Sequence, residues 1–357
     1  MIDPLRPLAA KKVAFVFGPG NISVDYAAAL VRGPERALLE LGGDVRTFNY
    51  APYRDEVLGQ PARRPWSDDL SVMRGVVSFF EEEGPFDLTL AYFPDVMLPS
   101  SVAEALKKRG GHLVNYPLNL LDQREHFTRA LQLFDETFCA EEGALQGLRN
   151  ARYVPMASDP WIFRPAGQAR EPRVLFVGSE YGERGEWLAR CAEVLPTTVS
   201  GSRFDLRSTV RSLGRAVVRE RRFPSAAVRR LADAVLRDRS PVGDEGYVRL
   251  AAQHGVSVGF SDVKEEATGR TVHKVRLREY DAAMTGLCHL ARRLPELERH
   301  FEPGQEMLLY DDPSELPGML EQIKRGLIDF RAVGQAARKR AARDHTWTVR
   351  LRKAFSG

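Results

Sequence analysis

Short apolar runs alternate along the chain with longer stretches in which apolar residues recur every three or four positions. The first two runs, VAFVF (13–17) and DVRTFNY (44–50), flank a helical pattern at 24–41. Apolar runs and helical patterns then alternate through 86–93, 100–109, 112–117, 136–140 and 152–157. Parallel strands need helical crossovers that cover both faces of the sheet, so this order predicts a doubly wound α/β domain. We expect Ser100 or Ser101 to cap the helix at 100–109.

The pattern of an apolar run, a glycine and a helical stretch, with which the chain begins, occurs again in its second half. A polar stretch with prolines at 158–172 has the composition of a linker. RVLFVGS (173–179) is again an apolar run that ends near a glycine, and an amphipathic stretch follows at 184–195. Further strands are predicted at 197–201, 255–260 and 307–311, with a helix at 275–284.

This repeat predicts two Rossmann-like domains, at 1–163 and 164–335. A final segment, 336–357, is predicted to be a helix that packs back toward the first domain. The length of 357 residues agrees with two domains, because one hydrophobic core seldom serves so long a chain. Such folds bind ligands at the carboxyl ends of their strands, so we expect a ligand-binding cleft where the two sheets face each other.

The composition favours a folded protein without membrane segments. Apolar residues make up 43% of the chain and charged residues 28%, which is too apolar for disorder. Neither a signal peptide nor a run of about eighteen apolar residues is present, so we expect a cytoplasmic location. Cys139, Cys191 and Cys288 lie far apart, which predicts buried free thiols rather than disulfides or a zinc site.

Positive charge is concentrated in one segment, 203–239. It holds eleven arginines against four acids, a net charge of +7, whereas the whole chain carries only +4. Five of the arginines recur every fourth residue, from Arg203 to Arg219, and so form a slowly drifting stripe on a helix. We favour a solvated helix face. The alternative is a docking surface for an anionic partner such as the inner face of a membrane, while nucleic acid is not expected.

Several motifs resemble one known family, the spore-maturation CgeB-like glycosyltransferases. The longest is REYDAAMTG (278–286), which is followed by LERHFEPGQEMLLYDDPSEL (297–316). FVGSEYGERGEWL (176–188) and VPMASDPWIFRP (154–165) resemble two further family segments and occur in the right order. This resemblance implies the glycosyltransferase B fold, with 1–163 as the acceptor domain and 164–335 as the donor domain that carries 203–239 as an insertion.

The resemblance also implies where a nucleotide-sugar donor binds. The family's ribose-binding glutamate corresponds to Asp281, which keeps the carboxylate but is one methylene shorter. Related enzymes often carry a second glutamate eight residues upstream, where this chain has His273. We therefore expect donor contacts from His273, Arg278, Tyr280, Asp281, Thr285 and Gly286. Gly286 is explained equally well as a helix stop.

A nucleoside diphosphate leaving group needs stabilisation of its negative charge, which arginines and backbone N–H groups can supply without a metal. Gly178 and Ser179 end a strand and allow close approach of a phosphate, and Arg184 follows on the first helical turn. Arg278 and Asp281 are three residues apart and so share a helix face; an ordinary ion pair is the competing explanation. Arg184 and Arg278 are the predicted catalytic residues.

The first domain offers a glycine-rich turn, Gly18, Gly20 and Asn21, that would face the donor phosphates, although any Rossmann turn predicts the same glycines. We expect neither a metal nor another cofactor. The pairs Asp68-Asp69 and Asp311-Asp312 are interpreted as solvated loop acids.

A retaining front-face mechanism needs no protein nucleophile. An inverting one needs a base, for which Asp25, His112 and His126 are candidates.

Two other functions remain open on the sequence. A nucleotide-sugar epimerase or hydrolase would use the same two-domain cleft and donor contacts. A non-catalytic protein that binds an anionic surface through 203–239 would depend on the arginine-rich segment instead. We favour a UDP-sugar donor, but the sequence names neither the donor base nor the sugar. It does not identify the acceptor either, which could be a small molecule, a glycan or a protein.

Overall fold

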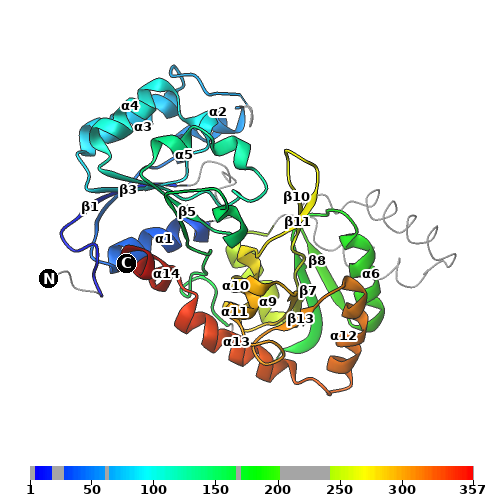
Figure 1. The fold of residues 1–357 in the computed structure, drawn as a ribbon. Coiled ribbons are helices and arrows are strands. Elements are labelled where there is room, and N and C mark those ends of the chain that lie inside the picture. Colours follow the sequence, from blue (N-terminus) through cyan, green and yellow to red (C-terminus); the bar gives the residue numbers. More distant parts are fainter. Residues whose placement is uncertain (1–4, 18–27, 61–63, 166–169, 202–241, 357) are drawn as a thin grey trace. The chain divides into compact units, whose positions relative to one another are not determined.

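The computed structural model describes residues 5–17, 28–60, 64–165, 170–201 and 242–356. The chain forms two compact units. Unit 1 comprises 1–157, 262–274 and 345–357, and unit 2 comprises 158–261 and 275–344. Each unit is built around one parallel sheet (Figure 1), which confirms the predicted pair of α/β domains.

The sheet of unit 1 has six parallel strands in the order β2-β1-β3-β4-β5-β6. Their bounds are β1 Lys12–Val16, β2 Asp44–Thr47, β3 Leu88–Ala91, β4 His112–Asn115, β5 Glu136–Cys139 and β6 Ala151–Tyr153. β1 and β3 lie in the centre and are buried along almost their whole length. This agrees with the continuous apolar runs in the sequence, because a parallel sheet is covered on both faces.

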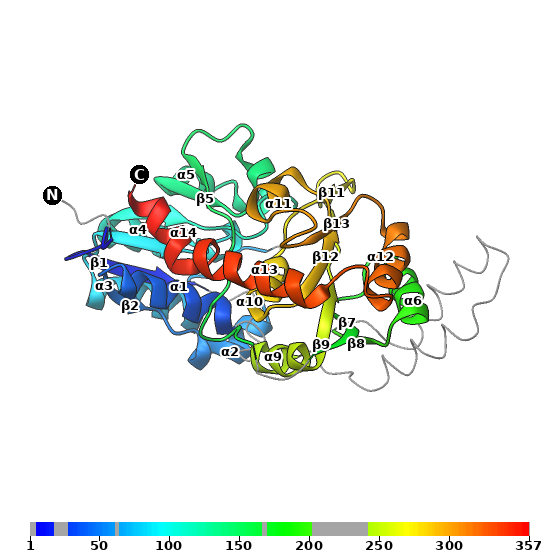
Figure 2. The ribbon, with the colours of Figure 1, turned by 90° about the horizontal axis from the view of Figure 1, so that it is seen from below.

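Helices and short 3-10 turns connect the strands of unit 1. The helices are α1 Ala28–Glu40, α2 Arg54–Leu58, α3 Ser71–Glu83, α4 Ser100–Arg109, α5 Ala130–Leu133 and α14 Trp347–Ser356. The 3-10 turns are η2 Ala51–Tyr53, η3 Asp95–Met97, η4 Arg124–Phe127 and η5 Glu142–Leu145. The chain's last helix, α14, packs against α1 (Figure 2). Trp347 lies so close to Gly33 there that a Cβ on Gly33 would come within 2.4 Å of the indole.

The predicted cap of helix α4 is wrong. The residue before the helix is Pro99, and neither Ser100 nor Ser101 caps it with its side chain. Instead Asp68, from a distant loop, accepts a hydrogen bond of 3.0 Å from the backbone N–H of Ser101 and another from its hydroxyl. The acid that we interpreted as solvated therefore satisfies a free N–H of the first turn.

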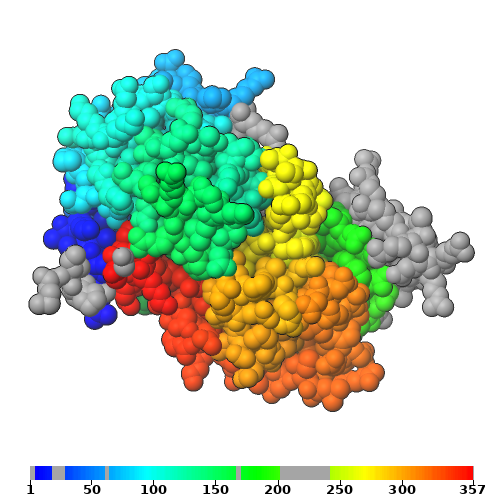
Figure 3. Space-filling model, viewed as in Figure 1, coloured from blue at the N-terminus to red at the C-terminus, as the bar shows by residue number. Residues whose placement is uncertain are grey.

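A two-stranded antiparallel hairpin, β10 Asp262–Lys264 and β11 Thr271–His273, completes unit 1. Its turn contacts the segment just before η4, where the backbone N–H of Glu266 donates to the carbonyl of Asp122 at 2.9 Å. In the space-filling view the yellow hairpin lies against the green residues of unit 1 (Figure 3). A segment within the second half of the chain therefore belongs to the first unit.

Unit 2 has a five-stranded parallel sheet in the order β13-β12-β9-β7-β8. The strands are β7 Glu171–Val177, β8 Thr197–Ser200, β9 His254–Val258, β12 Cys288–Arg292 and β13 Leu308–Tyr310. The helices are α6 Arg184–Val194, α9 Asp244–Gln253, α10 Leu277–Thr285, α11 Pro295–His300, α12 Leu316–Lys324 and α13 Phe330–Asp344, with a 3-10 turn η6 at Pro313–Glu315.

The two faces of this sheet differ in character. One face carries apolar side chains such as Phe176, Val258 and Leu290, which form a core with α6 and α12. Side chains alternate along a strand, so Ser257 and His289 point to the other face, where α10 contacts β12. Helix α10 thus covers a partly polar surface.

Two other expectations from the sequence can be compared with the structure. Cys139, Cys191 and Cys288 are free and buried, as predicted, and burial raises the pKa of each thiol to about 12. Among the described helices, none combines the length and the apolar character needed to cross a bilayer.

Helices α10 and α13 approach each other through two glycines, which gives a first test of the packing. Gly286 ends α10 with φ +78°, and a Cβ on Gly334 of α13 would lie 2.3 Å from the Gly286 carbonyl oxygen. We predict that Gly334→Ala destabilises the protein by roughly 1–3 kcal/mol, because the backbones must separate. A thermal melt measures the change.

Gly318→Ala in the exposed part of α12 is the matched control. A Cβ at Gly318 meets nothing within 4 Å, so this variant should gain roughly 0.5–1 kcal/mol from helix propensity. A Gly334→Ala protein as stable as Gly318→Ala would contradict the close approach.

Candidate active site

The carboxyl end of β7 forms a turn in which two backbones meet. Gly178 follows the strand, and its N–H donates to the carbonyl of Ser200 at 2.9 Å. Gly201 has φ +150°, and a Cβ there would lie 1.9 Å from the Gly178 carbonyl oxygen. Gly178 was predicted to contact the donor, whereas Gly201 was not, because the closeness of Gly201 to Gly178 depends on the pairing of β7 with β8.

Arg184, at the start of α6, lies at this turn. Its Nη1 donates to the carbonyl of Ser179 at 3.1 Å, and its guanidinium lies 5.3 Å from the ring centre of Tyr181 and 5.8 Å from that of Phe260. The residue is 9% exposed. The structure therefore brings Arg184 together with Gly178 and Ser179, and its contact with a phosphate stays a prediction.

At helix α10, Arg278 and Asp281 share a face as their spacing predicts. Arg278 Nη1 lies 3.4 Å from Asp281 Oδ2, and the guanidinium lies 4.2 Å from the ring centre of Tyr247 in α9. The other carboxylate oxygen, Oδ1, accepts a hydrogen bond of 2.8 Å from Ser158. The Arg278 side chain is 27% exposed, whereas that of Asp281 is 1% exposed.

The environment of Asp281 sets a condition on its proposed role. Burial raises the pKa of this carboxyl to about 7, although Arg278 and the Ser158 hydrogen bond act in the opposite direction. Asp244 and Asp159 raise the pKa further. The Asp281 carboxyl is almost inaccessible to solvent in this structure, so the ribose contact stays a prediction.

Of the other predicted residues at α10, Tyr280 and Thr285 are buried and Gly286 is partly buried. Tyr280 is 1% exposed, and its hydroxyl lies 2.8 Å from Nδ1 of His300. Thr285 donates to the carbonyl of Asp281 at 3.0 Å. Gly286 has the left-handed conformation of a helix C-cap, so the helix stop is present. Any donor contact by these three residues remains a prediction.

His273 is the remaining donor candidate among the described residues, and it does not lie on unit 2. His273 belongs to the hairpin of unit 1, where its Nδ1 lies 2.9 Å from Asp262. At the position where the resemblance implies a second glutamate, this chain thus has an imidazole with an acidic partner. Gly18, Gly20 and Asn21 lie outside the described residues, as do Asp25 and the arginine-rich segment 203–239.

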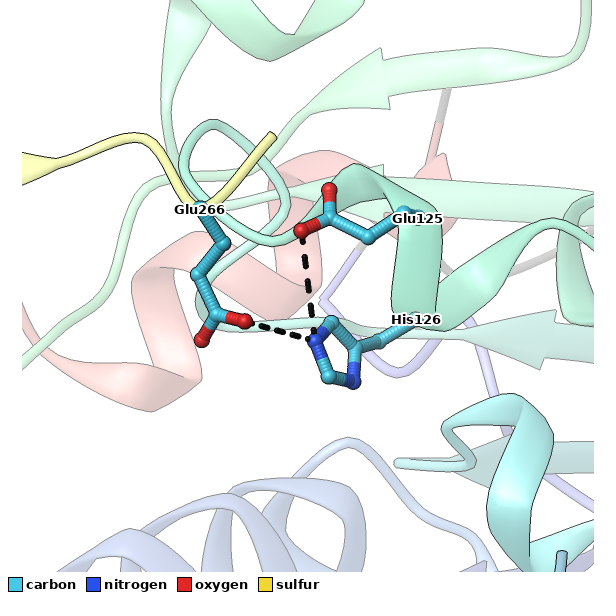
Figure 4. A group of neighbouring side chains, drawn as sticks. All are labelled: Glu125, His126 and Glu266. Atoms are coloured by element: carbon cyan, nitrogen blue, oxygen red, sulfur yellow. Dashed lines mark hydrogen bonds and ion pairs between the residues drawn. The ribbon is translucent and has the colours of Figure 1, made fainter. Parts of the chain in front are cut away.

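The two described candidate bases have acidic neighbours in unit 1. His112 lies 3.6 Å from Asp135 and 3.7 Å from Glu136. His126 Nε2 lies 3.0 Å from Glu266 Oε2 and 4.0 Å from Glu125 Oε1 (Figure 4). Gln123 also donates to Glu266 at 3.0 Å. The contacts of Glu266 with His126 and Gln123 hold the hairpin turn against η4.

The group Glu125, His126 and Glu266 also has ligand types that a divalent cation uses, and its three ligand atoms lie within 4.8 Å of one another. Both glutamates are exposed. The ion pair and the hydrogen bond already explain the arrangement of these side chains. The expectation that the protein needs no metal stays a prediction.

A buried ion cluster at the carboxyl ends of β4 and β5 was not found by the sequence analysis. Lys274 Nζ donates to Asp122 at 2.6 Å, Asn119 at 2.9 Å and Glu141 at 3.0 Å. The Lys274 side chain is 2% exposed and that of Glu141 is 1% exposed. All four residues belong to unit 1, where the lysine anchors the end of the hairpin.

Comparison with known proteins identifies the family. A family model described as glycosyl transferase-like matches residues 160–356, which is more than half of the chain. The chain therefore belongs to the glycosyl transferase-like family. No curated protein matches it.

Solved structures show the same fold. Anabaena Alr3699/HepE, solved in complex with UDP-glucose, has a TM-score of 0.62 and 14% identity, covering 97% of this chain and 98% of that one. AviGT4, a glycosyltransferase involved in avilamycin A biosynthesis, has a TM-score of 0.61 and 16% identity, covering 97% and 96%. Sucrose-phosphate synthase from Thermosynechococcus elongatus has a TM-score of 0.58 and 16% identity, covering 96% and 98%. The fold is glycosyltransferase B.

The ion cluster provides the second test. We predict that Lys274→Met destabilises the protein by roughly 3–5 kcal/mol, because two carboxylates remain inside unit 1 without their cation. Chemical denaturation measures the loss. Lys264→Met, at an exposed position of the same hairpin, should change stability by no more than about 0.5 kcal/mol. Equal effects of the two substitutions would show that the cluster does not stabilise unit 1.

Proposed function

We propose that this protein transfers a sugar from a nucleoside diphosphate sugar to an acceptor. Its membership of the glycosyl transferase-like family is the observation that carries the proposal, because the matched residues 160–356 include both arginine sites of unit 2. Arg184 lies at the turn after β7, and Arg278 begins α10 with part of its guanidinium exposed. Both positions suit an anionic leaving group.

The proposed chemistry follows from what these groups can stabilise. Breaking the bond between the sugar and the diphosphate places negative charge on the phosphate oxygens. Arg184, Arg278 and the backbone N–H groups after β7 would stabilise that charge without a metal ion. Tyr247 beneath the Arg278 guanidinium would keep it in place, since a cation is attracted to the ring face.

The finer parts of the proposal rest on resemblance. We infer a CgeB-like enzyme that retains the configuration at the transferred carbon, with the leaving phosphate itself accepting the acceptor's proton. A UDP-sugar is the donor we favour, because the similar Anabaena protein was solved with UDP-glucose. The acceptor is left open among small molecules, glycans and proteins, and the proposed location is cytoplasmic.

Nucleotide binding gives the third test. We predict that one family of nucleoside diphosphates raises the melting temperature of the parent, with UDP and UDP-sugars first, and that Arg278→Ala removes the shift. The loss of a charge-assisted contact should weaken binding by roughly 1.5–3 kcal/mol, or about 10- to 150-fold. Excess EDTA should leave the shift unchanged.

The control for this experiment is Arg249→Ala in α9, whose side chain is 75% exposed. It should bind nucleotide like the parent. A parent whose melting temperature responds to no nucleotide would rule out the proposed function, and a shift abolished by EDTA would rule out its metal independence.

A further inference from the structure

A second acid of helix α10, Glu279, is buried away from solvent. The residue is 2% exposed, and no ion pair between described residues includes it. Its Oε2 atom has no hydrogen-bond partner. Its neighbour Arg278 turns instead toward Tyr247 and Asp281. A carboxylate in such a place would be costly, so the structure requires a neutral acid.

The part of the sheet that α10 covers carries polar side chains. His289 of β12 is the register partner of Ser257 in β9, and its Nδ1 lies 2.7 Å from the Ser257 hydroxyl. His289 is fully buried and its Nε2 has no hydrogen-bond partner. Hence β9 and β12 present a buried imidazole on the face that α10 covers.

Gly259 has no side chain, and this leaves room for the His289 imidazole and the Glu279 carboxyl. A Cβ at this position would lie 2.7 Å from His289 Nε2 and 3.4 Å from Glu279 Oε1. The glycine backbone is held from both sides: its N–H donates to Leu290 at 2.8 Å, and its carbonyl accepts from Tyr310 at 2.7 Å. Acid and imidazole therefore converge on one point at the carboxyl end of β9.

From these contacts we propose that Glu279, with its carboxyl protonated, is a positioning residue that seats α10 on His289 and Gly259 and thereby aligns Arg278 and Asp281 for the donor. The inference rests on the proposed function for its last step only. The packing of protonated Glu279 against His289 and Gly259 is a property of unit 2 and is testable without any donor.

The electrostatics agree with this geometry. Burial raises the pKa of Glu279 to about 8, against the opposing effects of Arg276, Arg278 and nearby backbone N–H groups. Burial lowers the pKa of His289 to about 3, with Arg278 acting in the same direction. Both shifts favour the neutral form of the group near pH 7. Two charged groups of the neighbouring helices also face α10. Asp244 of α9 raises the pKa of Asp281, and Arg338 of α13 donates a hydrogen bond to the Met284 carbonyl.

The sign of the pH dependence follows from the raised pKa. The folded protein keeps a proton that the unfolded chain releases above about pH 4.5, so this group's contribution to stability is complete below that pH. It is lost as pH rises toward about 8. Above that pH the folded protein holds a buried carboxylate, and α10 should shift on its sheet.

The experiment compares the parent with Glu279→Gln, which has the same shape and cannot ionise. Melting temperatures measured between about pH 5 and pH 9 should fall more in the parent than in the variant. Asp281 also has a raised pKa, but it is present in both proteins and cancels in the difference. Glu245→Gln, with a side chain that is 93% exposed, is the matched control and should follow the parent.

Nucleotide affinity provides the functional readout. Above about pH 8 the dissociation constant of UDP should rise by roughly tenfold per pH unit in the parent, and remain flatter in Glu279→Gln. Equal pH dependence of affinity in the two proteins, with different stability profiles, would overturn the positioning role. If the melting temperatures of the two proteins depend equally on pH, the proposal that Glu279 is protonated in the folded protein is overturned. If no nucleotide binds at any pH, the proposed function fails, while the stability comparison still tests whether Glu279 is protonated in the folded protein.

Infrared spectroscopy covers the case in which Glu279→Gln does not fold. In an Asp281→Asn protein, Glu279 is the acid of α10 that remains buried, and its protonated carbonyl band should be present at about pH 7 and lost by about pH 9. A band that is already absent at pH 7 would overturn the inference.

Discussion

The burial of carboxyl groups under helix α10 is the constraint on which the arrangement of unit 2 depends. Asp281 and Glu279 are both nearly inaccessible to solvent, yet they are accommodated in different ways. Asp281 has a hydroxyl and a guanidinium as partners, whereas Glu279 lies in the space that Gly259 leaves open near His289. Each solution requires a specific neighbour on another element, so the position of α10 over the sheet is defined by polar groups as well as by apolar packing.

Apolar periodicity was sufficient to predict most of the fold. Strands such as β1, β3 and β7 are buried on both faces and therefore appear in the sequence as continuous apolar runs. Strand β12 was missed because CHLAR contains no β-branched residue and includes a histidine and an arginine. That histidine is His289, so the feature that concealed the strand is the polar group that α10 covers. The short hairpin strands β10 and β11 carried too few apolar residues to be predicted.

The candidate site was predictable where its contacts are local. Arg278 and Asp281 are three residues apart, and Arg184 reaches Ser179 over five residues, distances at which helix geometry and a short turn fix the neighbours. Ser158 lies 123 residues from Asp281, and Lys274 lies 152 residues from Asp122. Such contacts depend on which strands become neighbours in the sheet, and no local spacing encodes them. Ser158 was accordingly interpreted as linker, and the lysine cluster was not foreseen.

The three-part composition of unit 1 has a consequence for the order in which the protein can mature. Its sheet is complete after β6, but Lys274 and helix α14 are translated more than a hundred residues later. A nascent first half therefore exposes the surface of α1 that α14 will cover, and holds Asp122 and Glu141 without their cation. Domains often fold as soon as they leave the ribosome. Here the first unit reaches its final state only after 262–274 and 345–356 have been made, which couples its folding to the synthesis of the second unit.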